Sequence, residues 1–282
     1  MGGLGETSIR DIQLVELKLL LELDRICKML SIPYAIYFGT LLGAVRYKGF
    51  IPWDDDIDVV MIREDYERFL REAPSVLAEE YFLQTTDTDP EYPRTYAKIR
   101  DSSTTYIETY FADRKMNHGI NIDVFPLDGV PNNGVLRLLG WVLISAIGQP
   151  TFLRALNIKS PPMFNILRGF GKFIPLSDQF LIKLYSKLIT FMGSERWEFV
   201  AHSSFPAIAI HKLVYRKSWI KDTIPMEFEG HMFPAPREYA NILTGVYGDY
   251  MTPPPECKRE PNHLVEIVSV HFPYTDVEND EL

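Results

Sequence analysis

Residues 53–62 read WDDDIDVVMI, so four aspartates lie immediately before a run of β-branched and apolar residues. Successive side chains of a strand point to opposite faces. If the strand begins near Asp56, then Asp56 and Asp58 project to one side and the aliphatic residues between and after them project to the core. The rise of a strand puts two such carboxylates about 6 to 7 Å apart on one face, where they repel each other unless a cation lies between them. The segment therefore predicts a strand that carries a metal site at its start.

The chemistry of this site favours a hard divalent cation. Carboxylate oxygens suit Mg²⁺ or Mn²⁺, and the phosphates of a nucleotide would complete the octahedral coordination. A solvated acidic turn is the alternative, but apolar segments flank the aspartates on both sides, at 50–53 and 59–62. An EF-hand loop is excluded, because position 6 counted from Asp54 is Val59 instead of glycine.

A third acid, Asp123, lies in the segment INIDVF at residues 120–125. The aliphatic residues of this segment alternate with Asn121 and Asp123, so a strand would turn Asp123 away from the core. Paired carboxylates on one strand and a single carboxylate on another suit a site for two ions, one for the donor phosphates and one for the attacking hydroxyl. The alternative is that Asp123 caps a turn at the strand end.

Gly39 and Thr40 follow a predicted strand at 34–38 and precede a predicted helical turn at 41–46. Backbone N–H groups at such a junction can bind a phosphate, and glycine permits a close approach. Gly-Thr turns are common, so this turn indicates a phosphate site only because it lies one strand-and-helix unit before the acidic strand.

Strands and helices alternate along the chain, which is typical of the α/β class. Apolar residues at helical spacing predict a helix from Ser8 to Leu30, and Pro33 prevents its continuation. A polar-faced helix is predicted at 63–73. Strands are predicted at 57–62, 81–86, 96–100 and 120–125. The pattern does not define the order of the strands.

The net charge of −9 argues against nucleic acid as a partner. Residues 135–192 differ from the rest, with seven basic residues and one acid, a net charge of +6 that leaves −15 elsewhere. We therefore expect a core at 1–131, a basic, apolar helical insertion at 132–192, and a C-terminal part at 193–282 that completes the core and ends in an acidic tail. The insertion either packs on the core or lies on an anionic membrane surface. We expect a cytoplasmic protein, at the inner face of the membrane in the second case, because no secretory signal precedes the chain.

Three segments resemble the LicD family: YFGTLLGAVR at 37–46, FIPWDDDIDV at 50–59 and HGINIDVFPLD at 118–128. The similarity extends to 247–251 and 254–256, and it covers most of the chain apart from the basic middle region. This family has a nucleotidyltransferase-like fold and includes bacterial phosphocholine transferases, with fukutin-related proteins as distant relatives. The resemblance implies a polymerase-β-like mixed sheet with flanking helices and a helical insertion.

The resemblance also implies an activity. A phospho-alcohol, with phosphocholine favoured, would pass from CDP-choline or another CDP-alcohol to a sugar hydroxyl of a cell-surface glycan precursor, and CMP would be released. Lipopolysaccharide and teichoic acid are such glycans, and the acceptor could be linked to a lipid. Because the middle insertion varies most, the resemblance does not identify the acceptor.

By position, Gly39 and Thr40 match the family's nucleotide turn. Asp56 and Asp58 match the metal pair, and Asp123 matches the third acid, so these three are the expected catalytic residues. Asp54 is implied as a further ligand of Mg²⁺ or Mn²⁺, with two ions expected. Asp123 would help to remove the proton of the acceptor hydroxyl.

Four other residues are candidate substrate contacts. Lys98 and Arg100 share one strand face and could neutralise donor phosphates, or belong to a solvated surface strand. Arg46 could also reach a phosphate, or form a surface salt bridge. Trp53 could stack on the base or bind choline by cation–π contact, or anchor its loop to the core. No histidine receives a catalytic role.

Two other functions stay open. A nucleotidyltransferase would move NMP from an NTP to an alcohol and release pyrophosphate. A non-catalytic metal- or glycan-binding module is the second alternative, but binding alone does not require a third, isolated carboxylate.

Overall fold

The computed structural model describes residues 7–140, 142, 177–192, 196–202, 213–261 and 263–280. Its centre is a mixed sheet in the order β1-β2-β6-β4-β3, and β7 and β8 continue from the far end of β6. Only the β2–β6 pair is parallel among these described strands. The strands are β1 (Ala35–Ile36), β2 (Asp58–Ile62), β3 (Tyr81–Gln84), β4 (Ala97–Asp101), β6 (Ile120–Val130), β7 (Phe199–Ala201) and β8 (Val214–Arg216).

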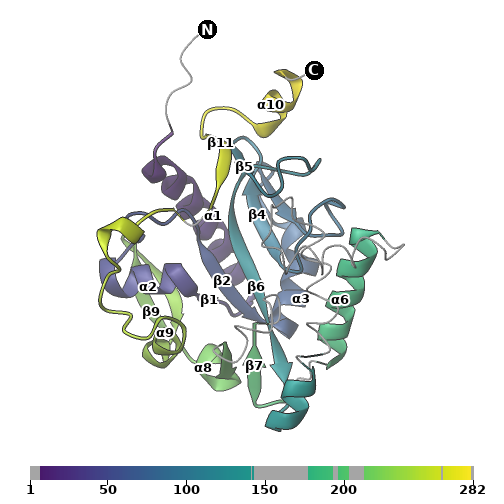
Figure 1. Ribbon diagram of the computed structural model, residues 1–282, viewed down its shortest axis with the longest axis vertical. Helices are drawn as coiled ribbons and strands as arrows, with labels where there is room; N and C mark the ends of the chain where they lie inside the picture. The colour runs from purple at the N-terminus through teal and green to yellow at the C-terminus, as the bar shows by residue number, and fades with distance from the viewer. Residues whose placement is uncertain are drawn as a thin grey trace.

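Helices flank this sheet (Figure 1). In that view α2 and α9 lie to the left of β6, while α3 and α6 lie to the right. The labelled α-helices are α1 (Ile9–Leu30), α2 (Phe38–Tyr47), α3 (Arg63–Glu72), α6 (Asp178–Met192), α8 (Lys217–Lys221), α9 (Tyr239–Tyr247) and α10 (Tyr274–Asp280). The prediction of an α/β fold with a mixed sheet and flanking helices is confirmed.

Helix α1 shows why local sequence defines some elements well. Its apolar stripe, including Leu19, Leu23 and Ile26, is fully buried against the sheet. Ser8 caps the start, since its hydroxyl accepts from the Asp11 N–H and the Asp11 carboxylate accepts from the Ser8 N–H at 2.9 Å. The predicted helix from Ser8 to Leu30 is therefore confirmed, with Ser8 as the cap.

Two predicted boundaries near the acidic segment are wrong. The strand predicted at 34–38 ends at Ile36, because Phe38 adopts a positive φ of 40° and starts α2 at once. Gly39 and Thr40 therefore lie inside the first turn of α2. The second strand begins at Asp58 instead of near Asp56, so Asp56 belongs to the preceding loop and strand alternation does not place its side chain.

Two further strand pairs involve the C-terminal part. β9 (Thr223–Phe228) and β10 (His231–Pro236) form a hairpin through Glu229 and Gly230, both with positive φ, as a tight two-residue turn requires. β11 (Val265–Ser269) pairs antiparallel with β5 (Thr105–Glu108). This second pairing returns the end of the chain to the N-terminal core.

Much of the basic insertion, 143–176, lies outside the described residues, and so does residue 141. The described part includes α6, and residues 134–140 are helical. After the insertion, β7 and β8 join the sheet through β6, while the proposed division into a core, an insertion and a C-terminal part stays a prediction. No helix within the described ranges is long and apolar enough to cross a membrane.

Candidate active site

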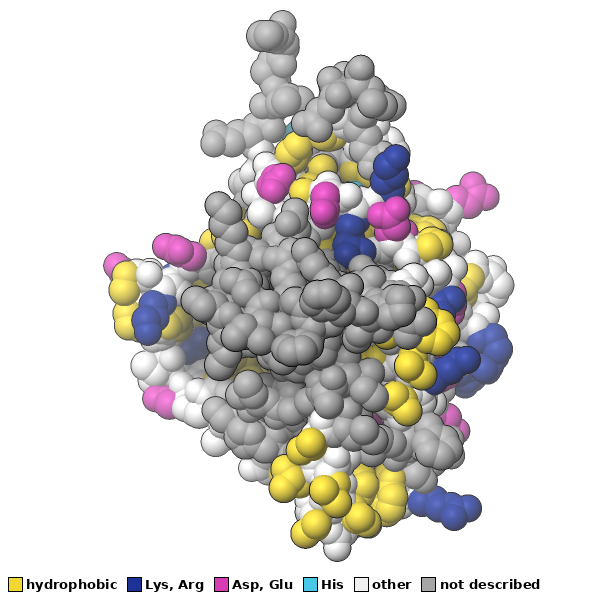
Figure 2. All heavy atoms as spheres, turned by 45° about the vertical axis from the view of Figure 1, so that its right-hand side comes forward, with side chains coloured by type: hydrophobic (Ala, Val, Ile, Leu, Met, Phe, Trp, Pro, Cys, Tyr) yellow, Lys and Arg dark blue, Asp and Glu magenta, His cyan; other side chains and the backbone are white. Residues whose placement is uncertain are grey.

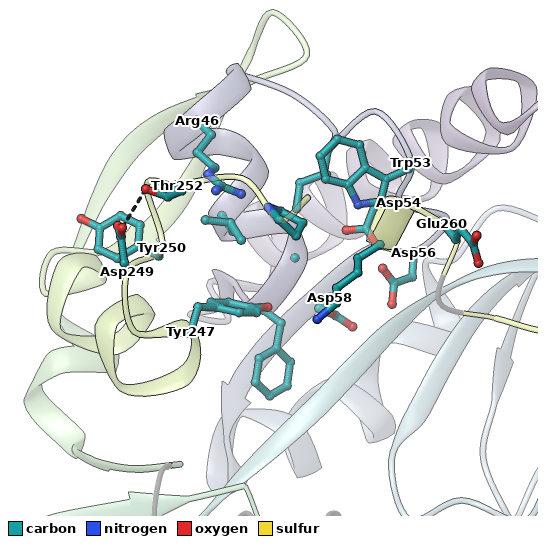
Figure 3. Close-up of a pocket in the computed structure, with 16 residues that line it drawn as sticks. Arg46, Trp53, Asp54, Asp56, Asp58, Tyr247, Asp249, Tyr250, Thr252 and Glu260 are labelled. Atoms are coloured by element: carbon teal, nitrogen blue, oxygen red, sulfur yellow. Dashed lines mark hydrogen bonds between the residues drawn. The ribbon is translucent and has the colours of Figure 1, made fainter. Parts of the chain in front are cut away.

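A cleft of about 400 Å³ lies where α2, the loop that precedes β2, and the segment after α9 meet. Figure 3 shows that Asp54, Asp56 and Asp58 enter it from one side, and that Arg46 points into it from α2. Tyr247, Asp249, Tyr250 and Thr252 lie across from the aspartates, whereas Glu260 lies beside Asp56 (Figure 3). Pro254 and Lys258 also line the cleft. The cleft therefore brings three of the four predicted metal ligands together with cations and aromatic rings.

Gly39 sets how closely the aspartates approach α2. A Cβ atom at this position would lie 2.5 Å from Asp54 Oδ2 and 3.8 Å from Asp56 Oδ1. The first distance is too short for any side chain. Gly39 thus leaves room for two carboxylates over the first turn of α2, which is a direct structural reason for glycine here.

Thr40 has a different position from the one expected. Its side chain is 2% exposed and does not line the cleft. Its Oγ1 accepts a hydrogen bond from the Asp58 N–H at 2.8 Å, and the Tyr37 N–H donates to the Asp58 carbonyl at 2.9 Å. Thr40 therefore joins the start of α2 to the start of β2 and positions Asp58.

Asp123 lies beside Asp58, because the parallel register of β2 and β6 pairs these two residues. Across the other edge of β6, Lys98 of β4 is paired with Asp123, and its Nζ lies 2.9 Å from Asp123 Oδ1. Lys98 also approaches Glu108 Oε1, at 3.6 Å. Asp56 and Asp123 line a second, small cavity of about 10 Å³. Asp56 lines the main cleft as well, so this residue borders both cavities.

The aspartates carry strong mutual repulsion. Burial is the main cause that raises the pKa of Asp54, to about 8, and the neighbouring Asp56 carboxylate adds to it. Burial also raises the pKa values of Asp56 and Asp58, again with help from nearby carboxylates. Asp54 and Asp56 share a hydrogen bond, as two carboxyl groups do when they hold a proton between them.

Such a donor set fits a hard divalent cation, which would replace the shared proton and relieve the repulsion. Within the described ranges, no three carboxylate, histidine or cysteine side chains already stand around one point at metal-ligand geometry. Asp54, Asp56 and Asp58 therefore face a common space without closing on it.

Lys98 and Arg100 are buried, 5% and 1% exposed, so the alternative of a solvated surface strand is wrong. Lys98 lies in the site, beside Asp123. Arg100 lines neither cavity. It donates to the Gly119 carbonyl at 2.6 Å and to Asn121 Oδ1 at 3.0 Å, and the Asn121 amide in turn donates to Asp123 Oδ1 at 3.1 Å. Arg100 supports Asp123 through Asn121.

Arg46 and Trp53 both line the cleft. The Arg46 Nε is buried and has no hydrogen-bond partner among the described residues, so this guanidinium keeps donor capacity for a ligand. Trp53 packs partly against the core, and the Arg259 guanidinium lies 5.3 Å from the centre of its ring. Trp53 therefore anchors its loop and also offers a surface to the cleft.

A cluster around Asp55 was not anticipated. This buried carboxylate accepts a hydrogen bond from the Tyr106 hydroxyl at 2.8 Å and contacts His263 Nδ1 at 3.2 Å. Burial opposes a charge on His263, but Asp55 and Asp56 outweigh it and raise the His263 pKa to about 9. His263 comes close only because β11 pairs with β5, a contact across about half the chain that no local spacing indicates.

Comparisons with known proteins identify the family of this chain. The family model described as LicD/FKTN/FKRP, nucleotidyltransferase domain, matches residues 31–141, which include α2, the acidic loop and Asp123. The lipopolysaccharide cholinephosphotransferase LicD of Haemophilus influenzae is 33% identical over 92% of this chain and 97% of its own length. Two shorter matches are to uncharacterized proteins. The one from Rickettsia typhi is 50% identical over 16% of this chain and 14% of its own length. The one from Rickettsia prowazekii is 57% identical over 12% of this chain and 13% of its own length. The chain belongs to the LicD family.

Proposed function

We propose that this protein transfers a phospho-alcohol, with phosphocholine favoured, from a CDP-linked donor to a sugar hydroxyl of a cell-surface glycan precursor, with release of CMP. The observation that carries the proposal is the cleft in which Asp54, Asp56 and Asp58 face Arg46. The similarity to a lipopolysaccharide cholinephosphotransferase over nearly the whole chain supports the choice of phosphocholine and of a glycan acceptor.

In the proposed site, Asp54, Asp56, Asp58 and Asp123 hold Mg²⁺ or Mn²⁺, with two ions expected. The metal supplies positive charge that stabilises the transferring phosphoryl group and lowers the pKa of the acceptor hydroxyl. Thr40 fixes the Asp58 backbone, and Lys98 and Asn121 hold the Asp123 carboxylate from two sides. The chain thereby orients its acids before the substrate arrives.

Arg46 and Lys258 line the same cleft and are the cations suited to the donor's two phosphates. Gly39 leaves the carboxylates room beside them. Trp53 and Tyr247 offer aromatic faces for the cytosine base or the trimethylammonium group of choline. Asp249, which also lines the cleft, adds a negative charge that suits the trimethylammonium group.

The proposed reaction is an in-line displacement at the phosphorus that carries the alcohol. The acceptor oxygen forms a bond to this phosphorus, and the bond to the bridging oxygen breaks, so CMP leaves with that oxygen. Asp123 accepts the proton of the acceptor hydroxyl. Arg46 stays in contact with the phosphate of the departing CMP.

A thermal-shift screen tests the donor. The protein is heated with Mg²⁺ and CDP-choline, CDP-ribitol, CDP-glycerol, CTP or CMP in turn. Preferential stabilisation by one CDP-alcohol is expected, because a ligand that binds only the folded state raises the melting temperature. Stabilisation by CTP above every CDP-alcohol would favour NMP transfer, and pyrophosphate among the products would establish it.

A further inference from the structure

A larger groove, about 730 Å³, lies outside the metal-binding cleft. We name it the α6 groove. Its walls come from α3, the turn after β3, the segment directly before β4, and α6. The lining includes Tyr96, Thr95, Thr85, Ser186, Lys187 and Thr190.

Tyr96 forms the boundary between the α6 groove and the catalytic acids. Its ring packs on Phe125, with centroids 4.4 Å apart. Phe125 follows Asp123 by two residues on β6, so these two side chains lie on one face of the sheet, the face that also carries Lys98 opposite Asp123. Tyr96, directly before β4, packs on this face, so one wall of the groove contacts the face that carries Asp123.

The position of the α6 groove suits an acceptor. In an in-line displacement the attacking hydroxyl approaches the phosphorus from the side opposite the leaving group. Arg46 and Lys258 place the leaving CMP in the cleft beside α2 and the segment after α9. The groove is lined in part by α3 and α6, which lie on the other side of β6 from α2 and α9 in Figure 1, so an acceptor bound there would approach from the side away from the CMP.

The chemistry of the lining suits an oligosaccharide with anionic groups. Five small hydroxyl side chains (Thr85, Thr86, Thr95, Ser186 and Thr190) can exchange hydrogen bonds with sugar hydroxyls, and Tyr66 and Tyr96 add aromatic rings. Two lining cations are engaged by the protein, since Lys183 Nζ lies 2.6 Å from Asp87 and Arg63 Nε lies 2.7 Å from Asp128. A third lining cation, Arg94, lies 4.9 Å from the centre of the Phe111 ring. Lys187 is exposed on α6 and forms no ion pair with another described residue, so it is the lining cation that we assign to the ligand.

We propose that the α6 groove binds the glycan acceptor, an anionic oligosaccharide, and delivers its terminal hydroxyl past Tyr96 to Asp123. This inference rests on the proposed function, because it assigns the acceptor to a site apart from the donor cleft. It also gives α6, part of the basic insertion, a role in choosing the acceptor.

Two groove variants test the proposal. Lys187→Glu reverses the free charge, and Ser186→Tyr fills the groove with a side chain that a helix surface tolerates. Lys18→Glu is the matched control, because Lys18 is exposed on α1 and lines neither the cleft nor the groove. The probes are delipidated lipopolysaccharide core oligosaccharides and a neutral dextran oligosaccharide, and CMP release from CDP-choline is followed at increasing oligosaccharide concentrations.

The expected result is a KM for the anionic oligosaccharide that rises about tenfold or more in both groove variants, with no change in Lys18→Glu. The affinity for CDP-choline, measured by calorimetry without acceptor, stays at the wild-type value in all three. An unchanged acceptor KM in both groove variants, or no stimulation of wild-type CMP release by any anionic oligosaccharide, would overturn the groove assignment. CDP-choline that fails to bind the wild-type protein would instead overturn the proposed donor, so the two failures are distinguishable.

Discussion

Single residues in the cleft control how closely negative charges approach one another. Gly39 is the clearest case, because a Cβ atom there would meet Asp54 Oδ2 at 2.5 Å. We predict that Gly39→Ala displaces Asp54 and lowers metal-dependent CMP release about 100-fold, as small misplacements of a catalytic group do. Gly134→Ala is the control, since a Cβ atom at Gly134 meets nothing within 4 Å, and a loss of activity in this variant would contradict the explanation.

The aspartates also predict how stability depends on pH. A carboxyl group whose pKa is higher in the folded state than in the unfolded state stabilises the fold at low pH, and this contribution is lost as the pH rises through the folded pKa. The pKa values of Asp54 (about 8), Asp56 and Asp58 are all raised in the folded state. The melting temperature in EDTA should therefore fall between pH 5 and pH 9. Mg²⁺ should restore it most strongly at the alkaline end, and an equal effect of Mg²⁺ at both ends would argue against a carboxylate metal site.

Replacing one acid gives a complementary result. Asp58→Asn removes a proposed metal ligand and also a buried source of repulsion. CMP release should drop by at least about 100-fold, while the melting temperature in EDTA at pH 8 should stay level or rise. A variant that lost stability and activity together would indicate a structural role for Asp58 instead.

At the scale of elements, the pairing of β11 with β5 brings His263 to Asp55. The contact holds Asp55, which lies between the two loop acids Asp54 and Asp56. We predict that His263→Ala lowers kcat about tenfold, whereas His263→Asn keeps most of the activity because its amide can still donate to Asp55. His231→Ala, at an exposed position of β10, should behave as wild type. Equal losses in the Ala and Asn variants would show that the hydrogen bond to Asp55 is not what matters.

Elements determined by nearby residues were predictable from the sequence. The stripe and cap of α1 and the alternation in β6 depend on residues a few positions apart, and both are present in the structure. These local patterns marked Asp58 and Asp123 as strand carboxylates, but that they are neighbours depends on the pairing of β2 with β6, which the sequence pattern did not define. The early start of α2 was not predictable, because it coincides with a positive φ at Phe38, which no pattern of nearby residues indicates.

Long-range contacts account for the rest. Arg100 resembled a phosphate ligand in the sequence, but the return of β6 beside β4 places the Gly119 carbonyl and Asn121 around its guanidinium. His263 had no local signal at all, since its partner Asp55 lies 208 residues earlier in the chain. The C-terminal residues of the cleft, such as Tyr247 and Lys258, likewise reach the aspartates only through tertiary packing.

At the scale of the whole molecule, hydrophobic side chains gather at the lower end, where the chain leaves β6 (Figure 2). The large aliphatic residues exposed there, each 54% or more, are Val135, Leu136, Leu138, Leu139 and Val142. They begin the basic region at 135–192, whose net charge of +6 suits an anionic lipid surface. The membrane reading of this region stays a prediction.

Vesicle sedimentation tests this prediction. The protein should sediment with vesicles that contain phosphatidylglycerol, and binding should weaken as salt rises, because the attraction is partly electrostatic. Leu136→Ser combined with Leu139→Ser should reduce binding, with Met232→Ser, another exposed position, as the control. Absence of binding to anionic vesicles at low salt would favour the alternative that the region packs on the core.

The central claim is that the carboxylates beside α2 transfer phosphocholine from a CDP-linked donor. The most direct measurement incubates the protein with Mg²⁺, choline-labelled CDP-choline and lipopolysaccharide, and follows CMP and labelled glycan together. We predict that the two products form in equal amounts, that EDTA abolishes both, and that Asp58→Asn lowers both. Labelled glycan that forms equally well with Asp58→Asn, or CTP consumed to pyrophosphate while CDP-choline stays intact, would contradict the claim.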